Sequence, residues 1–201
     1  MADMQAFEQE CTQFFRPLWP GEDKILVFGD GNTDHPPLML IGEAPGEQET
    51  LKRRPFVGKA GKNLDGFLEL MGMERQEIYV SNVVKIRPTA RSTSGRVRNR
   101  APSKEEIALF LPFLMKEIDL VAPRALVTLG NVPLRALTGD KSTIGDMHGA
   151  WHTAVNGLPL FALYHPAAII YRRELLSVYE QDMCSLRDSL TIQTQKCCFQ
   201  A

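Results

Sequence analysis

The chain has 201 residues, of which 44% are hydrophobic, a length that suits one α/β domain with a buried core and is short for two. Its formal net charge of −1 does not by itself indicate a nucleic-acid partner, so any affinity for DNA must come from local patches. No apolar run approaches the roughly 18 residues of a membrane span and no signal-like stretch begins the chain, so we expect a cytoplasmic protein without a membrane segment.

In chain order, hydrophobic spacing predicts strands that alternate with helices. Buried strands are expected over residues 38–41, 78–84, 125–130 and 160–164. Helices are expected over residues 4–16, 61–71, 103–121 and 173–190. This alternation predicts an α/β fold, a three-layer α/β/α sandwich around a four-stranded, mainly parallel sheet. We expect a single domain over residues 1–190, a frayed tail over residues 191–201 and, because no helix face stands out for association, a monomer.

An acidic, glycine-rich turn, residues 42–49, follows the first expected strand. Gly42 and Gly46 let the backbone come close to a flat or small molecule, and Pro45 between them stiffens the turn. Loops that bind phosphate pair glycines with a lysine or a helix amino terminus and avoid clustered glutamates. The turn therefore predicts a pocket for a neutral or cationic planar group.

Five motifs in order resemble those of family 4 uracil-DNA glycosylases. They are residues 42–46, 54–61, 82–85, 99–102 and 164–167, and the match extends roughly from residue 28 to residue 190. The resemblance implies a small α/β/α sandwich and a DNA-repair enzyme that flips uracil out of DNA and hydrolyses its N-glycosidic bond. The substrate would be uracil-containing DNA, single- or double-stranded.

The carboxyl ends of parallel strands share one edge of a sheet, so the residues that follow them meet in one cleft. Asn82 offers the amide donor and carbonyl acceptor that reading uracil requires, although an asparagine there is often a turn cap. His165 could donate to uracil O2 as charge builds on the leaving base, or be a satisfied core residue. The resemblance favours recognition for Asn82 and catalysis for His165.

Phe56 lies in a loop, where its ring could stack on a flipped base or anchor the loop in the core, and the resemblance favours stacking. The Ala44 amide is a further candidate donor to the base. Faster relatives in the superfamily carry an aspartate where this chain has Ala44, so base catalysis by that side chain is unavailable. Glu43 and Glu49 are the candidate carboxylates for the sugar cation or the water, and spacing does not decide between them.

A basic stretch without acidic residues runs from residue 85 to residue 104. Its position at the cleft edge favours phosphate contacts over a merely solvated loop. The predicted DNA-binding residues in it are Lys85, Arg87, Arg91, Arg96, Arg98 and Arg100. The stretch also resembles the loop of an X-type relative that bonds covalently to DNA, but Asn99 replaces the bonding histidine, so ordinary turnover is expected.

A second candidate DNA contact follows His165. Ile170, Tyr171 and Arg172 combine apolar bulk with charge, and such a segment can wedge into the minor groove and hold a flipped base out. Alternatively, the segment is the first turn of a helix with a buried face.

Family 4 enzymes usually hold a 4Fe-4S cluster on four cysteines. Here the corresponding positions read Cys11, Phe14, Ile86 and Phe110, and the chain's other cysteines, Cys184, Cys197 and Cys198, have no zinc-site spacing. A cluster needs thiolates, so we expect no cluster, no metal and apolar side chains in its place. This departure keeps a rival hypothesis open, a non-catalytic DNA-binding relative. A small-molecule nucleoside hydrolase is a third, although it would have little use for the basic stretch.

Overall fold

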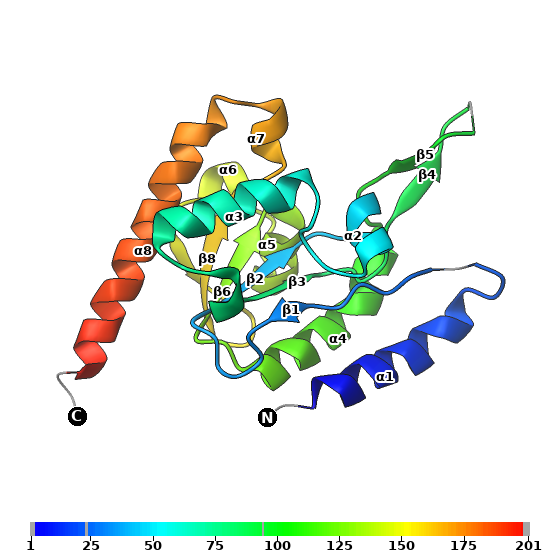
Figure 1. The fold of residues 1–201 in the computed structure, drawn as a ribbon, viewed down its shortest axis with the longest axis horizontal. Helices are drawn as coiled ribbons and strands as arrows, with labels where there is room; N and C mark the ends of the chain where they lie inside the picture. The colour runs from blue at the N-terminus through cyan, green and yellow to red at the C-terminus, as the bar shows by residue number, and fades with distance from the viewer. Residues whose placement is uncertain (1–2, 23, 94, 199–201) are drawn as a thin grey trace.

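A computed structural model describes residues 3–22, 24–93 and 95–198 of the chain (Figure 1). Within these residues one sheet has six strands in the order β1-β3-β2-β6-β8-β7. They are β1 (Asp30–Gly31), β2 (Leu38–Gly42), β3 (Tyr79–Asn82), β6 (Ala125–Leu129), β7 (Trp151–Thr153) and β8 (Pro159–Leu163). The four expected strands are β2, β3, β6 and β8, all mutually parallel. Their existence and direction are confirmed.

The sheet is wider than the four strands expected from the sequence. Two short strands pair antiparallel at its edges, β1 with β3 and β7 with β8. Strand β1 consists of Asp30 and Gly31, which show no apolar alternation; the first is partly buried and the second is exposed. Such edge strands are held by backbone hydrogen bonds more than by side-chain burial, which is why the hydrophobic pattern does not reveal them.

Helices cover both faces of the sheet, so the predicted three-layer α/β/α sandwich is confirmed (Figure 1). The elements outside the sheet are α1 (Met4–Phe15), η1 (Arg16–Leu18), α2 (Glu47–Lys52), α3 (Lys59–Met71), η2 (Arg75–Glu77), α4 (Lys104–Val121), α5 (Asn131–Thr138), α6 (Ile144–Met147), α7 (Ala168–Tyr171) and α8 (Leu175–Cys198). Alternate residues of β2 separate the two cores. Met39 and Ile41 pack with α1, α4 and α5, whereas Leu38 and Leu40 pack with α3 and α8.

The end of α3 and the start of α4 follow the expected capping chemistry. Helix α3 ends at Gly72 in the left-handed conformation (φ 67°), and α4 begins with reciprocal bonds between Ser103 and Glu106. Helix α8 continues to Cys198, so its predicted end at residue 190 was wrong. The frayed tail expected over residues 191–201 stays a prediction. Residues 199–201 of that tail lie outside the described residues. No helix in the described ranges is long and apolar enough to cross a membrane.

Much of the basic stretch forms a β-hairpin. Strands β4 (Thr89–Arg91) and β5 (Val97–Asn99) pair antiparallel as a small separate sheet that projects from the body of the molecule (Figure 1). All six residues of these strands are exposed. The hairpin therefore holds several arginines in solvent.

Lys85 does not belong to this exposed surface, and its prediction as a DNA contact was wrong. Its side chain is fully buried, and its ammonium group donates to Glu117 (2.5 Å), to the Ser81 hydroxyl (2.6 Å) and to the Asn82 carbonyl (2.8 Å). The Glu117 carboxylate, also fully buried, accepts from the hydroxyls of Tyr79 and Ser81. Since a buried charge requires a partner, this lysine serves the core under the end of β3.

We expect Lys85→Met to lower the free energy of unfolding by about 3–5 kcal/mol, because it leaves the Glu117 carboxylate buried without its cation. Adding Glu117→Leu should recover part of this loss, since the unpaired charge is then removed. Urea unfolding followed by circular dichroism measures both. Lys116→Met is the matched control: Lys116 pairs with Glu10 at the surface, and its loss should cost about 1 kcal/mol or less. Equal losses for the two lysine variants would contradict the expectation.

Candidate functional site

The strand register brings the predicted site residues to one edge of the sheet. Gly42 pairs with Asn82, and Leu129 pairs with Leu163, two residues before His165. A pocket of about 280 Å³ opens at this edge. Its described lining consists of Ala44, Gly46, Glu47, Gln48, Glu49, Phe56, Gly58, Lys59, Ala60, Asn82, Asn99, His165 and Ala167. The five motifs thus all contribute to one pocket.

Gly42 allows two of the predicted base-binding side chains to come together. A Cβ atom at Gly42 would lie 2.5 Å from both the Asn82 Oδ1 atom and the Phe56 ring, closer than real Cβ contacts allow. Asn82 is 3% exposed and Phe56 is 6% exposed. The glycine is therefore required because the floor of the pocket is packed against its backbone.

The Phe56 and His165 rings lie next to each other, 5.9 Å apart between centroids and inclined by 26°. Phe56 has a left-handed backbone (φ 52°), which is uncommon for a bulky residue. Gly130, at the end of β6, comes so close to His165 that a Cβ there would lie 3.2 Å from the histidine Cβ. Both rings line the pocket, so a planar guest would contact an aromatic face and an imidazole together.

His165 is a neutral hydrogen-bond donor in this setting. Its Nδ1 atom accepts from the Ala167 amide (3.1 Å), which places the proton of the neutral ring on Nε2. Burial lowers its pKa to about 4, against a weaker upward pull from Glu49. At neutral pH the side chain therefore offers one N–H and no positive charge.

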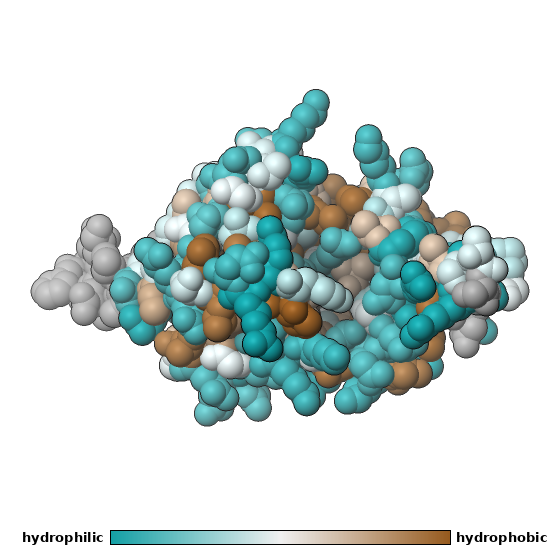
Figure 2. Space-filling model, turned by 90° about the horizontal axis from the view of Figure 1, so that it is seen from above, coloured by the Kyte–Doolittle hydropathy of each residue, from teal (hydrophilic) through white to brown (hydrophobic). Residues whose placement is uncertain are grey.

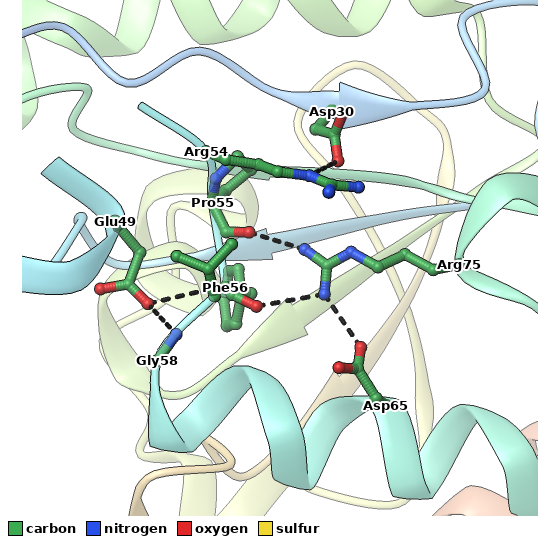
Figure 3. Close-up of polar contacts among 9 residues, drawn as sticks. Asp30, Glu49, Arg54, Pro55, Phe56, Gly58, Asp65 and Arg75 are labelled. Atoms are coloured by element: carbon green, nitrogen blue, oxygen red, sulfur yellow. Dashed lines mark hydrogen bonds and ion pairs between the residues drawn. The ribbon is translucent and has the colours of Figure 1, made fainter. Parts of the chain in front are cut away.

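Glu49 uses its carboxylate to tie two loops together. It accepts from the amides of Val57 (3.1 Å) and Gly58 (2.8 Å) in the loop that carries Phe56 (Figure 3). It also accepts from the amide of Gly46 (3.1 Å) and so links this loop to the acidic turn. It also lines the pocket, whereas Glu43 is not part of the described lining. Burial raises the pKa of Glu43, whose carbonyl accepts from the amide of Val84.

Several lining residues escaped the sequence analysis. Glu47, in the acidic turn, lines the pocket and pairs with Arg87 (3.3 Å). Gln48 and Lys59 line it too, and Asn99, noted only as a replaced histidine, accepts from Arg87 (2.7 Å). Their positions within or beside the motifs were the available signal.

The remaining predicted DNA contacts divide into paired and exposed arginines. Arg100 makes two bonds to the Glu106 carboxylate (2.6 and 2.7 Å), and these bonds raise the pKa of Arg100. Arg91, Arg96 and Arg98 lie exposed on the β4–β5 hairpin. Arg100 is thus engaged at the start of α4, while the hairpin carries cations into solvent.

The segment after His165 has features of both alternatives, an exposed wedge and the first turn of a helix with a buried face. Ile169 is buried at the start of α7, as in the first turn of a packed helix. Ile170 is 41% exposed and Tyr171 85% exposed, and Arg172 is exposed as well. Figure 2 views the molecule from the side of α7 and the hairpin and shows a mainly hydrophilic surface, hollowed between the parts that carry them. These three exposed side chains are therefore available to a ligand larger than the pocket.

The four positions compared with cluster ligands, Cys11, Phe14, Ile86 and Phe110, do not suit an iron–sulfur cluster. Cys11, Ile86 and Phe110 are buried, and the Phe110 ring stacks on Phe15 (4.2 Å between centroids), while Phe14 is 48% exposed and does not fill the core as expected. Burial raises the pKa of the Cys11 thiol to about 12, so its neutral form dominates. Within the described residues no group of three or more His, Cys, Asp or Glu side chains could hold a metal ion.

Comparisons with known proteins agree with this geometry. The family model of the uracil DNA glycosylase superfamily matches residues 28–184. The type-4 uracil-DNA glycosylase of Sulfurisphaera tokodaii is 36% identical over 159 residues, which cover 75% of this chain and 69% of that protein. That of Thermotoga maritima is 34% identical over 178 residues, which cover 87% and 86%. The crystal structure of SMUG2 from Pedobacter heparinus shares the fold, with a TM-score of 0.56 at 11% identity, over 94% of this chain and 98% of that one.

The chain is an α/β/α sandwich with a pocket at the carboxyl edge of its sheet. Its match over residues 28–184 shows that it belongs to the uracil-DNA glycosylase superfamily. Within it, relatives more than 30% identical over most of the chain are type-4 members, so the resemblance carried by the five motifs is confirmed.

We expect the ring of His165 to titrate near pH 4 in the folded protein. The unfolded histidine binds its proton near pH 6.5, before the folded one does. As the pH falls, protonation therefore stabilises the unfolded state, and the free energy of unfolding should decrease by up to about 3 kcal/mol between pH 6.5 and pH 4. NMR titration of the imidazole carbons and urea unfolding across this range test both. His165→Gln should flatten that part of the stability curve. A His165 transition at pH 6.5 or above would contradict the expectation.

Proposed function

We propose that this protein excises uracil from DNA by hydrolysing the N-glycosidic bond, as a monofunctional DNA-repair glycosylase. The observation that carries the proposal is the pocket in which Asn82, Phe56 and a neutral His165 converge at one edge of the sheet. Glycosylases of this kind reach a base by flipping it out of the helix. The size and burial of the pocket support the same route here, because a stacked base could not enter it.

The side chains of the pocket divide the recognition of a uracil base. The Phe56 ring offers a face for stacking, and the Asn82 amide offers a donor and an acceptor to the O4 and N3–H edge. His165 offers its Nε2–H as a donor for uracil O2, and the Ala44 amide offers a second donor. Cytosine presents an amino donor where uracil has O4, so the same asparagine contributes to discrimination.

The reaction breaks the bond between the sugar C1′ and uracil N1. Negative charge moves onto the base, where the His165 and Ala44 donors stabilise it, while the sugar becomes cationic. Water adds to C1′, and the proton that it releases balances the charge of the departing uracil, leaving free uracil and an abasic site. A neutral histidine suits this step because its N–H donates a hydrogen bond to the base, and the ring has no positive charge to lose.

Of the two candidate carboxylates, we assign the sugar cation to Glu49. Its carboxylate lines the pocket, whereas Glu43 is not part of the described lining. Its oxygens already accept three amide hydrogens, so it acts by fixed negative charge more than by moving a proton. Glu43 remains the second candidate, through the water.

DNA would lie across the face that Figure 2 shows. The exposed arginines of the hairpin, Arg91, Arg96 and Arg98, are placed to contact phosphates, and Ile170, Tyr171 and Arg172 of the α7 segment to hold the vacated site. Arg87 completes the rim of the pocket through Glu47.

We further propose that the reaction runs without an iron–sulfur cluster, because a single protonated Cys11 replaces four thiolates. The single domain over residues 1–190, the monomeric state and the cytoplasmic location stay predictions from the sequence.

The first test is excision of uracil from a labelled oligonucleotide, single-stranded or with uracil opposite guanine, followed by alkaline cleavage of the abasic site. We expect turnover by the wild type and a loss of about 10²- to 10³-fold in kcat for His165→Ala, since it removes one donor to the developing anion. Asn82→Ala should lose activity while DNA binding, measured by fluorescence anisotropy, persists. Tight, uracil-dependent binding without turnover would instead favour the non-catalytic relative.

A second test concerns the hairpin. Arg98→Gln should weaken binding to DNA irrespective of sequence and lower the slope of log affinity against log salt by about 1, because one phosphate contact is lost. Arg124→Gln is the matched control. Arg124 directly precedes β6, at the opposite, amino edge of the parallel sheet, and its removal should leave the slope unchanged. Equal slopes for Arg98→Gln and wild type would remove the hairpin from the DNA interface.

A further inference from the structure

The loop that presents Phe56 is held in a conformation that its own sequence disfavours. Phe56 has φ 52°, in the left-handed region where bulky side chains are strained. A strained residue persists only where its surroundings fix it. The contacts that fix Phe56 therefore decide where its ring lies in the pocket.

Two charged side chains form hydrogen bonds with this loop from opposite sides (Figure 3). On one side, the Glu49 carboxylate accepts from the amides of Val57 and Gly58. On the other, the Arg75 guanidinium donates to the carbonyls of Pro55 (2.6 Å) and Phe56 (3.2 Å). In this short loop, amides thus donate to a carboxylate and carbonyls accept from a guanidinium, so each backbone dipole meets a charge of the opposite sign.

Arg75 is itself held in place. It belongs to η2, it donates to Asp65 of α3 (3.0 Å), and its side chain is 16% exposed. Helix α3 also approaches the loop from below, where a Cβ atom at Gly61 would lie 1.8 Å from the Phe56 carbonyl oxygen. The Phe56 carbonyl therefore has one defined position, between the Gly61 backbone and the arginine.

We propose that Arg75 is a positioning residue that acts through Phe56, holding its ring where a flipped uracil would stack. The inference rests on the proposed function and deepens it. Arg75 is not among the described lining of the pocket, so it does not contact the base. Its planar fork reaches two successive carbonyls, which a single ammonium group cannot do with the same geometry.

A purely structural role for Arg75 makes a different prediction. If the arginine merely joined α3 to the loop, its removal would lower stability, and its effect on catalysis would not depend on which side chain stands at position 56. If it positions the ring, removing it should have no further effect once the ring is gone.

The test is a double-mutant cycle with Arg75→Met, Phe56→Ala and both together, assayed by uracil excision below the melting temperature of every variant. We expect Arg75→Met to lower kcat/KM on the order of 10- to 100-fold, as misplacement of a binding group does. In the Phe56→Ala background the same change should alter kcat/KM less than about twofold. Arg75→Lys should recover only part of the activity. Arg135→Met is the matched control, since that exposed arginine donates to a remote carbonyl, Ser142 O, and should leave kcat/KM unchanged.

A second readout does not depend on activity. Hydrogen–deuterium exchange of the peptide that contains Val57 and Gly58 should be faster in Arg75→Met and unchanged in Arg135→Met. Unchanged exchange in Arg75→Met, or additive losses in the double-mutant cycle, would overturn the proposed positioning role. Absence of turnover by the wild type would overturn the proposed function instead, and the exchange experiment would still decide whether Arg75 fixes the loop.

Discussion

The parallel register of β2 with its two neighbours is the constraint on which the pocket depends. It places Gly42 beside Asn82 and ends β2, β3, β6 and β8 at one edge, so residues more than a hundred positions apart, such as Phe56 and His165, meet in one pocket. A shift of one residue would turn Asn82 toward the opposite face of the sheet. The buried side chains on both faces of β2, such as Leu40 and Ile41, resist that shift because each would enter the wrong core.

The buried pair of Lys85 and Glu117 lies directly behind this edge. A charged pair in a core gives little net stability compared with apolar side chains of the same size, so its presence calls for another reason. Lys85 donates to the carbonyl of Asn82, the residue whose side chain faces the pocket. On the same side of the sheet, the Phe110 and Phe15 rings stack on each other in the core. This side of the sheet therefore combines apolar packing with a buried polar cluster behind Asn82.

The sequence predicted the parallel strands, the sandwich and the convergence of Asn82 and His165, because apolar periodicity and strand ends are local properties of the chain. The place of Phe56 beside them was implied by the resemblance of the motifs alone. The sequence could not predict the burial of Lys85, since a lysine next to five arginines has the same local pattern whether it faces water or Glu117, 32 residues away. Edge strands and the extension of α8 escaped for a similar reason. Backbone pairing determines the edge strands and tertiary packing determines the length of α8, and the hydrophobic periodicity of the sequence contains information on neither.

The geometry of the Phe56 loop shows how a neutral pocket is built with charged residues. Glu49 and Arg75 carry opposite charges, and both bind backbone groups of this loop, so together they fix the position of the Phe56 ring (Figure 3). The groups that would contact a base are then an amide, a ring and an uncharged imidazole, and the neutrality of His165 follows from the same burial. Because these donors and the ring are fixed before any base arrives, little reorganisation remains when negative charge appears on the leaving group.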